Sequence, residues 1–150
     1  MKLEVIKVIY NGTNLYTVFE NEESTLYHEN NKFIIYTKKE KLLANFSSDN
    51  VSDEGITLNF DNIELNNPID YKDILDKWNF FMDISNIKKM HFEGNEKKYS
   101  SVYNYLFCCC TAIDPLPPRY RIPDLYLVKI SKVFRKAKRE LNRFIQDIIE

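Results

Sequence analysis

The pattern of apolar and polar positions is most regular in residues 67–89, which read NPIDYKDILDKWNFFMDISNIKK and contain the only tryptophan of the chain. Apolar residues recur there with the spacing of one helix face, at Ile74, Leu75, Trp78, Phe81 and Met82. Asp70 precedes this face, and an aspartate in that place can accept hydrogen bonds from the free amides of the first helical turn. We therefore predict a helix that begins after Asp70 and buries Trp78 in the core.

A second pattern, alternation with a period of two, is found in the first third of the chain. Residues 3–10 are rich in β-branched and apolar side chains, residues 15–19 alternate, and the Asn-Gly pair between them favours a tight hairpin turn. Residues 33–36 have the composition of a third strand, and residues 56–60 alternate again. The first three segments predict an antiparallel meander, whose apolar face requires a cover of other elements.

The remaining patterns are helical. Residues 38–47 follow a capping-box spacing and predict a short helix, and residues 99–110 predict a longer one. Residues 113–123 hold four of the five prolines and predict an extended connection. Asp124 is the expected cap of a last helix, whose apolar positions step by three and four as far as Ile148.

These elements predict an α+β fold in which an N-terminal antiparallel β-meander packs against C-terminal helices. A length of 150 residues, with 44% hydrophobic and 29% charged residues, is typical of one globular domain that spans residues 1–150. With only three glycines, glycine-rich phosphate-binding loops are excluded. The first residues lack the apolar segment of a signal peptide, and no apolar run is long enough to cross a membrane. We therefore expect a cytoplasmic protein without a membrane partner.

Candidate catalytic and metal-binding residues are few. The histidines, His28 and His91, lie far apart in sequence, and the cysteines are the adjacent Cys108, Cys109 and Cys110. Neighbouring side chains on a helix diverge by about 100°, so three consecutive cysteines cannot ligate one metal ion. A nucleophile pair of Cys109 and His91 is conceivable, but no local feature activates the thiol. We expect no metal, no cofactor and no enzymatic activity, and at least one cysteine in the core.

Charge is distributed unevenly along the chain, although the net charge is only −1. Residues 49–76 contain eight acidic residues and a single base, Lys72, whereas residues 115–150 contain nine basic and four acidic residues. The basic helix can be a solvated face or a binding face, whereas carboxylates on a long connection suit a basic protein partner. We predict that such a partner binds at Asp49, Asp53, Glu54, Asp61, Glu64, Asp73 and Asp76.

Three segments in a fixed order carry a resemblance to a known family. They are WNFFMDIS at residues 78–85, the aromatic YNYLF at residues 103–107, and a proline-rich link that ends at Pro123 before a closing amphipathic helix. Over residues 69–145 this order resembles small bacterial immunity proteins of contact-dependent inhibition and other polymorphic toxin systems. The three adjacent cysteines depart from that pattern. The resemblance implies a non-enzymatic protein that binds a cognate toxin C-terminal domain in the cytoplasm and blocks it.

Two other functions stay open. A nucleic-acid-binding or regulatory module would use the basic face of the last helix, with Lys132, Arg135, Lys136 and Arg139. The apolar stripe of that helix counts against this use because it requires the helix to pack on the core, and the near-neutral net charge counts against bulk nucleic-acid binding. A small-molecule enzyme is the third possibility. The leading hypothesis is an immunity protein that occludes the active site or another surface of a toxin.

Overall fold

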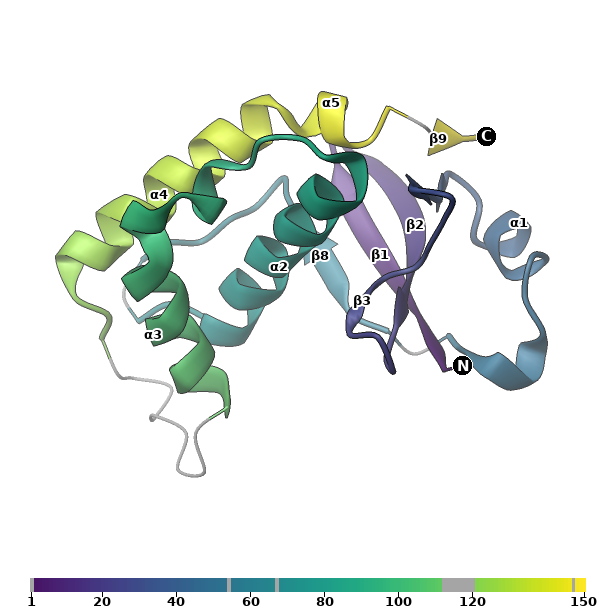
Figure 1. Ribbon diagram of the computed structural model, residues 1–150, viewed down its shortest axis with the longest axis horizontal. Helices are drawn as coiled ribbons and strands as arrows, with labels where there is room; N and C mark the ends of the chain where they lie inside the picture. The colour runs from purple at the N-terminus through teal and green to yellow at the C-terminus, as the bar shows by residue number, and fades with distance from the viewer. Residues whose placement is uncertain (1, 54, 67, 112–120, 147) are drawn as a thin grey trace.

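The computed structural model describes residues 2–53, 55–66, 68–111, 121–146 and 148–150. Strands lie mainly in the N-terminal half and helices in the C-terminal half, so the predicted α+β fold is confirmed. In Figure 1, helix α2 (Tyr71–Lys88) lies between the sheet and the outer helices α3 (Ser100–Thr111) and α4 (Asp124–Arg139). The short helix α1 (Lys39–Leu43) lies on the other side of the sheet.

The strands are β1 (Leu3–Tyr10), β2 (Thr13–Glu20), β3 (Thr25–Leu26), β4 (His28–Glu29), β5 (Lys32–Phe33), β6 (Ile35–Tyr36), β7 (Val51–Ser52), β8 (Thr57–Asn59) and β9 (Ile148–Ile149). The antiparallel hairpin of β1 and β2 pairs Leu3 with Glu20 and continues to the turn. Asn11 and Gly12 form that turn with φ angles of 50° and 71°. These positive values are those of the predicted two-residue hairpin, which favours Asn-Gly for this reason.

The sheet is mixed, and not only an antiparallel meander. β6 pairs antiparallel with β2, as predicted for the third strand, but β7 and β8 pair parallel with β1, and β9 pairs parallel with β6. The strand predicted in residues 56–60 is confirmed by β8. Its alternation buries Leu58 and the neighbouring Phe60, whose ring lies 5.4 Å from Phe80 on α2. Burial against α2 explains why this connection joins the sheet.

Alternation along the hairpin divides the core between the two faces of the sheet. Ile6 and Val8 pack in the large cluster beneath α2. Val5 pairs with Val18 on the opposite face, where both pack with Leu42 of α1. The meander is therefore covered on both sides, with the larger cover on the α2 side.

Helix α2 begins and packs as predicted. Asp70 caps it, because one carboxylate oxygen accepts from the amide of Asp73 at 3.1 Å. The helix ends at Lys88, and the C-cap residue Lys89 has the left-handed φ of 55°. Trp78 is 0% exposed and confirms the predicted core position. Its ring centroid lies 6.0–6.5 Å from those of Phe92, Tyr99, Tyr103 and Phe134.

The last helix differs from the prediction at both ends. Pro123 is the capping residue, and its carbonyl accepts from the amides of Tyr126 and Leu127, whereas Asp124 is already the first residue of the helix. The helix ends at Arg139, and a short helix α5 (Leu141–Phe144) follows. Ile148 belongs to β9 because it pairs with β6, so its spacing from the helical positions was misleading.

Two further predictions, one of a helix and one of a loop, are also revised. The helix predicted in residues 38–47 is only α1, and its cap is Lys38 without a side-chain bond. The polar loop predicted after α2 forms two 3-10 turns, η2 (Glu93–Asn95) and η3 (Lys97–Tyr99), with Phe92 and Glu93 buried. A further 3-10 turn, η1 (Ser48–Asn50), precedes β7. Residues 112–120, which include most of the predicted proline-rich connection, lie outside the described residues.

Candidate functional site

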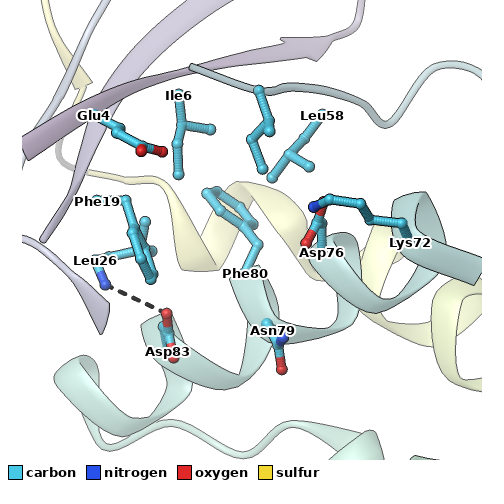
Figure 2. A pocket seen from close by; sticks show the side chains of 11 residues that line it. Glu4, Ile6, Phe19, Leu26, Leu58, Lys72, Asp76, Asn79, Phe80 and Asp83 are labelled. Atoms are coloured by element: carbon cyan, nitrogen blue, oxygen red, sulfur yellow. Dashed lines mark hydrogen bonds and ion pairs between the residues drawn. The ribbon is translucent and has the colours of Figure 1, made fainter. Parts of the chain in front are cut away.

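A cleft of about 190 Å³ lies between α2 and the sheet face that it covers (Figure 2). Helix α2 contributes Lys72, Asp76, Asn79, Phe80 and Asp83. The opposite wall consists of Glu4, Ile6, Phe19, Leu26, Ile56 and Leu58. These residues come from β1, β2, β3 and the region of β8, so the cleft joins segments that are distant in sequence.

The periodicities of the helix and strand explain this arrangement. Asp76, Asn79 and Asp83 recur at intervals of three and four, so they share one face of α2. Glu4 and Ile6 are two residues apart on β1 and therefore point to one face of the sheet. The floor is apolar, because Phe80 and Leu58 are both buried. The sequence thus places carboxylates around a hydrophobic hollow.

Asp83 is the most perturbed acid of the cleft. Burial raises the pKa of its carboxyl group to about 6, against the lowering effects of the Leu26 amide and of His28. The Leu26 amide donates to Oδ2 at 3.3 Å, a long hydrogen bond for this donor and acceptor. The carboxylate of Asp83 is thus partly desolvated, and nearby groups compensate little of the cost of burying its charge.

The other polar groups of the cleft have partners. Glu4 accepts from the side chain of Asn21 at 3.2 Å. Asp76 pairs with Lys72 at 2.8 Å, and this hydrogen bond raises the pKa of the lysine. The Oδ1 atom of Asn79 accepts from the Tyr103 hydroxyl at 2.9 Å, which leaves its amide nitrogen as a donor.

The cleft combines charged groups with apolar walls. Its described lining contains three carboxylates and one ammonium group, but no hydroxyl, thiol or imidazole group that could act as a nucleophile. Its volume is below the roughly 300–1,000 Å³ of typical small-molecule sites. A negative, narrow and partly apolar hollow is suited to one cationic side chain.

The structure separates the carboxylates that were predicted to bind a partner, and several have internal partners. Asp53 pairs with Lys39 of α1 at 2.7 Å. Asp61 accepts from the amides of Asn11 and Gly12 at 2.6 and 2.8 Å, and thereby fixes the hairpin turn. Asp73 pairs at 2.6 Å with Lys77, whose side chain is 1% exposed.

The remaining predicted acids fall into three places. Asp49 is exposed on η1, and Glu64 is exposed beside a second hollow of about 270 Å³ that Asp70 and Asp73 also line. Asp76 lies in the cleft, and Glu54 lies outside the described residues. The structure therefore brings Glu64 and Asp73 together, and it does not gather all the predicted acids on one surface. Their role in partner binding stays a prediction.

A cluster that the sequence reasoning missed follows α2. One ligand atom each of His91, Glu93 and Glu96 lies within 4.8 Å of the others, a set that the H-x-E-x-x-E spacing could have revealed. Glu93 already accepts from Lys136 at 2.9 Å and lies 3.4 Å from the Lys98 ammonium group. The hydrogen bond from Lys136 is the main cause that lowers the pKa of Glu93 to about 2. Two ammonium groups at one carboxylate disfavour a metal ion here.

The cysteines take three different environments on α3. Cys108 is exposed, Cys109 is buried, and Cys110 is intermediate, so the prediction of at least one core cysteine is confirmed. Burial raises the pKa of the Cys109 and Cys110 thiols, which keeps them protonated and weakly nucleophilic. His91 pairs with Glu96 at 3.4 Å, near the opposite end of α3. The conceivable pair of Cys109 and His91 therefore has no support.

The basic face of α4 is also divided. Lys136 is held by Glu93, whereas Lys132, Arg135 and Arg139 are exposed and make no ion pair within the described part of the chain. These three residues are separated by three and four positions, so they form one stripe. The apolar positions Ile130, Val133, Phe134 and Ala137 are buried on the other side of the helix.

The two cleft acids that sequence reasoning missed are Glu4 and Asp83. A weak signal for Asp83 was its place two turns after Asp76 on the polar side of α2. Glu4 interrupts an apolar strand, which is a signal only once it is known that α2 covers that face of the sheet.

Comparison of the chain with protein-family models, curated proteins and solved structures finds no match. Among the described residues, no helix has both the length and the apolar character needed to cross a membrane.

Proposed function

We propose that this chain is a non-enzymatic immunity protein, which binds a cognate toxin C-terminal domain in the cytoplasm and occludes its active site or an essential surface. The observation that carries the proposal is the acid-rimmed cleft between α2 and the sheet, since its carboxylates and apolar walls can bind a cationic group of a protein partner. The resemblance of residues 69–145 to immunity proteins of polymorphic toxin systems supports the same function.

Two exposed carboxylates lie outside the cleft. Asp49 and Glu64 are exposed, and no ion pair within the described residues engages them. Carboxylates of this kind steer a basic partner during its approach, and their effect weakens as salt screens it. Toxin domains that act on nucleic acids have basic sites, so an acidic surface suits their occlusion.

Growth rescue tests this proposal. The candidate toxin for this test is a C-terminal domain of any large secreted protein that is encoded beside this chain, expressed in bacteria with and without the chain. Rescue of growth, together with a stable complex in size-exclusion chromatography, is the expected result. A toxin domain that kills equally well with this chain, and forms no complex with it, would contradict the proposal.

The acidic surface has its own kinetic test against the same toxin domain. Asp49→Asn with Glu64→Gln should slow association, and the difference from the parent should shrink at high salt. Glu40→Gln is the control for the loss of an exposed carboxylate as such, since this residue lies on α1 and is not one of the predicted partner-binding acids. Equal association rates of the double variant and the parent at both salt concentrations would remove these two acids from the interface.

A second candidate function is nucleic-acid binding through α4. The specific observation in its favour is the exposed stripe of Lys132, Arg135 and Arg139, for which no ion pair is seen in the described residues. Fluorescence anisotropy with a duplex DNA and a duplex RNA, at two salt concentrations, tests it. Binding that weakens steeply with salt, and is lost in Arg135→Ala with Arg139→Ala, would favour this function over the first.

A further inference from the structure

We propose that the cleft between α2 and the sheet is a socket for one arginine side chain of the protein partner. The inference rests on the proposed function for the source of the arginine, whereas the socket itself is a property of this chain. Its support comes from the apolar walls, the positions of the carboxylates and the small volume of the cleft.

The walls suit the apolar stem and flat head of an arginine. Ile6, Leu26 and Leu58 supply aliphatic surface for the three methylene groups. Phe19 and Phe80 line the same hollow from the sheet and from the helix (Figure 2). A guanidinium group stacks on aromatic rings and loses less hydration than an ammonium group when it does so. The aromatic lining therefore favours arginine over lysine.

The carboxylates supply acceptors from both walls. Glu4 comes from β1, whereas Asp76 and Asp83 come from α2 (Figure 2). A carboxylate can accept about four hydrogen bonds, and among the described residues Asp83 accepts only the long one from Leu26. A guanidinium group has five donors in a fixed fork, so it can bond to more than one of these acids. Lys72 neutralises Asp76, which leaves Glu4 and Asp83 as the main acceptors.

The buried charge of Asp83 is only partly compensated within the described residues. Burial raises its pKa to about 6 because no nearby group fully compensates the buried charge. A guanidinium group within the cleft would supply that compensation. The volume of about 190 Å³ limits the occupant to one side chain, which excludes a folded segment of the partner from the hollow.

The experiment uses the full chain and N-acetyl-arginine N-methylamide, which carries the arginine side chain on a neutral backbone. Amide NMR shifts are followed during titration, and saturable shifts are expected at Leu26, Phe80 and Asp83. The matched citrulline derivative has nearly the same shape without the charge. It should bind about tenfold or more weakly, since each charge-assisted hydrogen bond is worth at least that factor. The lysine derivative should also bind more weakly than arginine.

Variants locate the binding. Glu4→Gln with Asp83→Asn should weaken binding of the arginine derivative by about tenfold or more, whereas the α1 control Glu40→Gln should leave it unchanged. Thermal unfolding and the dispersion of the NMR spectrum check that each variant is folded. The citrulline comparison uses the parent chain, so the proposal stays testable even if the double variant does not fold.

Three outcomes would overturn the socket. They are the absence of saturable shifts in the cleft, equal binding of citrulline and arginine derivatives, and binding of lysine as strong as that of arginine. The growth-rescue assay separates these outcomes from a failure of the proposed function. Growth rescue without arginine binding would support the immunity function and refute the socket. Arginine binding without growth rescue would support the socket and refute the immunity function.

Discussion

Replacement of Trp78 by alanine is the most direct test of how this fold is held together. The side chain is 0% exposed, and four aromatic rings surround it within 6.5 Å, from η2, η3, α3 and α4 or their flanks. Truncation of a buried tryptophan costs about 3–5 kcal/mol. We expect the upper part of this range, because rings from separate elements cannot all move into one cavity.

The expected loss of stability in Trp78→Ala is large relative to the total free energy of unfolding. A domain of this kind is stable by about 5–15 kcal/mol, and 1 kcal/mol shifts the melting temperature by about 2–4 °C for this size. Trp78→Ala should therefore lower the melting temperature by roughly 10 °C, and the urea midpoint by about 2 M for a denaturant slope of about 2 kcal/mol per M. Circular dichroism is the suitable probe, because the variant has no tryptophan left to fluoresce.

Trp78→Phe separates ring packing from the indole N–H. In the described residues, the buried Nε1 atom has no hydrogen-bond partner. A buried donor without a partner costs about 1–3 kcal/mol, so its removal offsets part of the lost packing. Trp78→Phe should cost about 1–2 kcal/mol, less than half the loss in Trp78→Ala. Leu125→Ala, at a 63% exposed position, is the control with little effect. An unchanged midpoint in Trp78→Ala would refute the reasoning.

Three further predictions follow from buried groups. Asp73→Asn removes the negative charge beside the buried Lys77 ammonium group, which keeps only neutral acceptors such as the Asn62 carbonyl at 3.4 Å, and should cost about 2–3 kcal/mol in urea unfolding. Lys77→Met should be nearly neutral, and the reverse order would contradict the pairing. The pKa of Glu93 is lowered from 4.5 to about 2, so its carboxylate stabilises the fold above about pH 4.5, and this contribution disappears as the pH falls toward 2. Glu93→Gln should therefore be less stable than the parent at pH 7. Its free energy of unfolding, measured at a series of pH values, should also change less between about pH 4.5 and 2. Replacement of Cys108, Cys109 and Cys110 by alanine should lower stability through Cys109 and preserve toxin rescue, and a folded triple variant without rescue would reveal a missed role of the thiols.

Local patterns predicted the elements whose causes are local. The cap at Asp70, the stripe around Trp78 and the Asn-Gly turn each depend on a few adjacent residues, and each is found in the structure. Ile148 shows the limit of this reasoning, since its spacing fits a helix but its backbone pairs with a distant strand. Strand partners more than a hundred residues away leave no mark in local periodicity.

The candidate site was harder to predict than the fold. Acidic residues were counted along the sequence, but Asp61 bonds the hairpin turn and Asp73 pairs with Lys77, so neither is simply a free charge. The cleft depends on Glu4 and Asp83, which come together only because α2 covers the sheet face of β1. The number of acidic residues in a stretch of sequence is therefore a poor guide to the charge of the folded surface, because backbone amides and lysines can pair with those carboxylates.

The parallel pairing of β9 with β6 has a consequence for the order of folding. Ile148 and Ile35 are more than a hundred residues apart, and for a free chain the length-dependent cost of such a closure is about 4 kcal/mol. Packing of Phe144 against Phe81, at 5.7 Å between ring centroids, leaves only a few residues to close. The last strand should therefore dock after α5 has joined α2. Hydrogen exchange at the Thr37 amide, which donates to Ile149, would then report on the integrity of the helical layer from the far edge of the sheet.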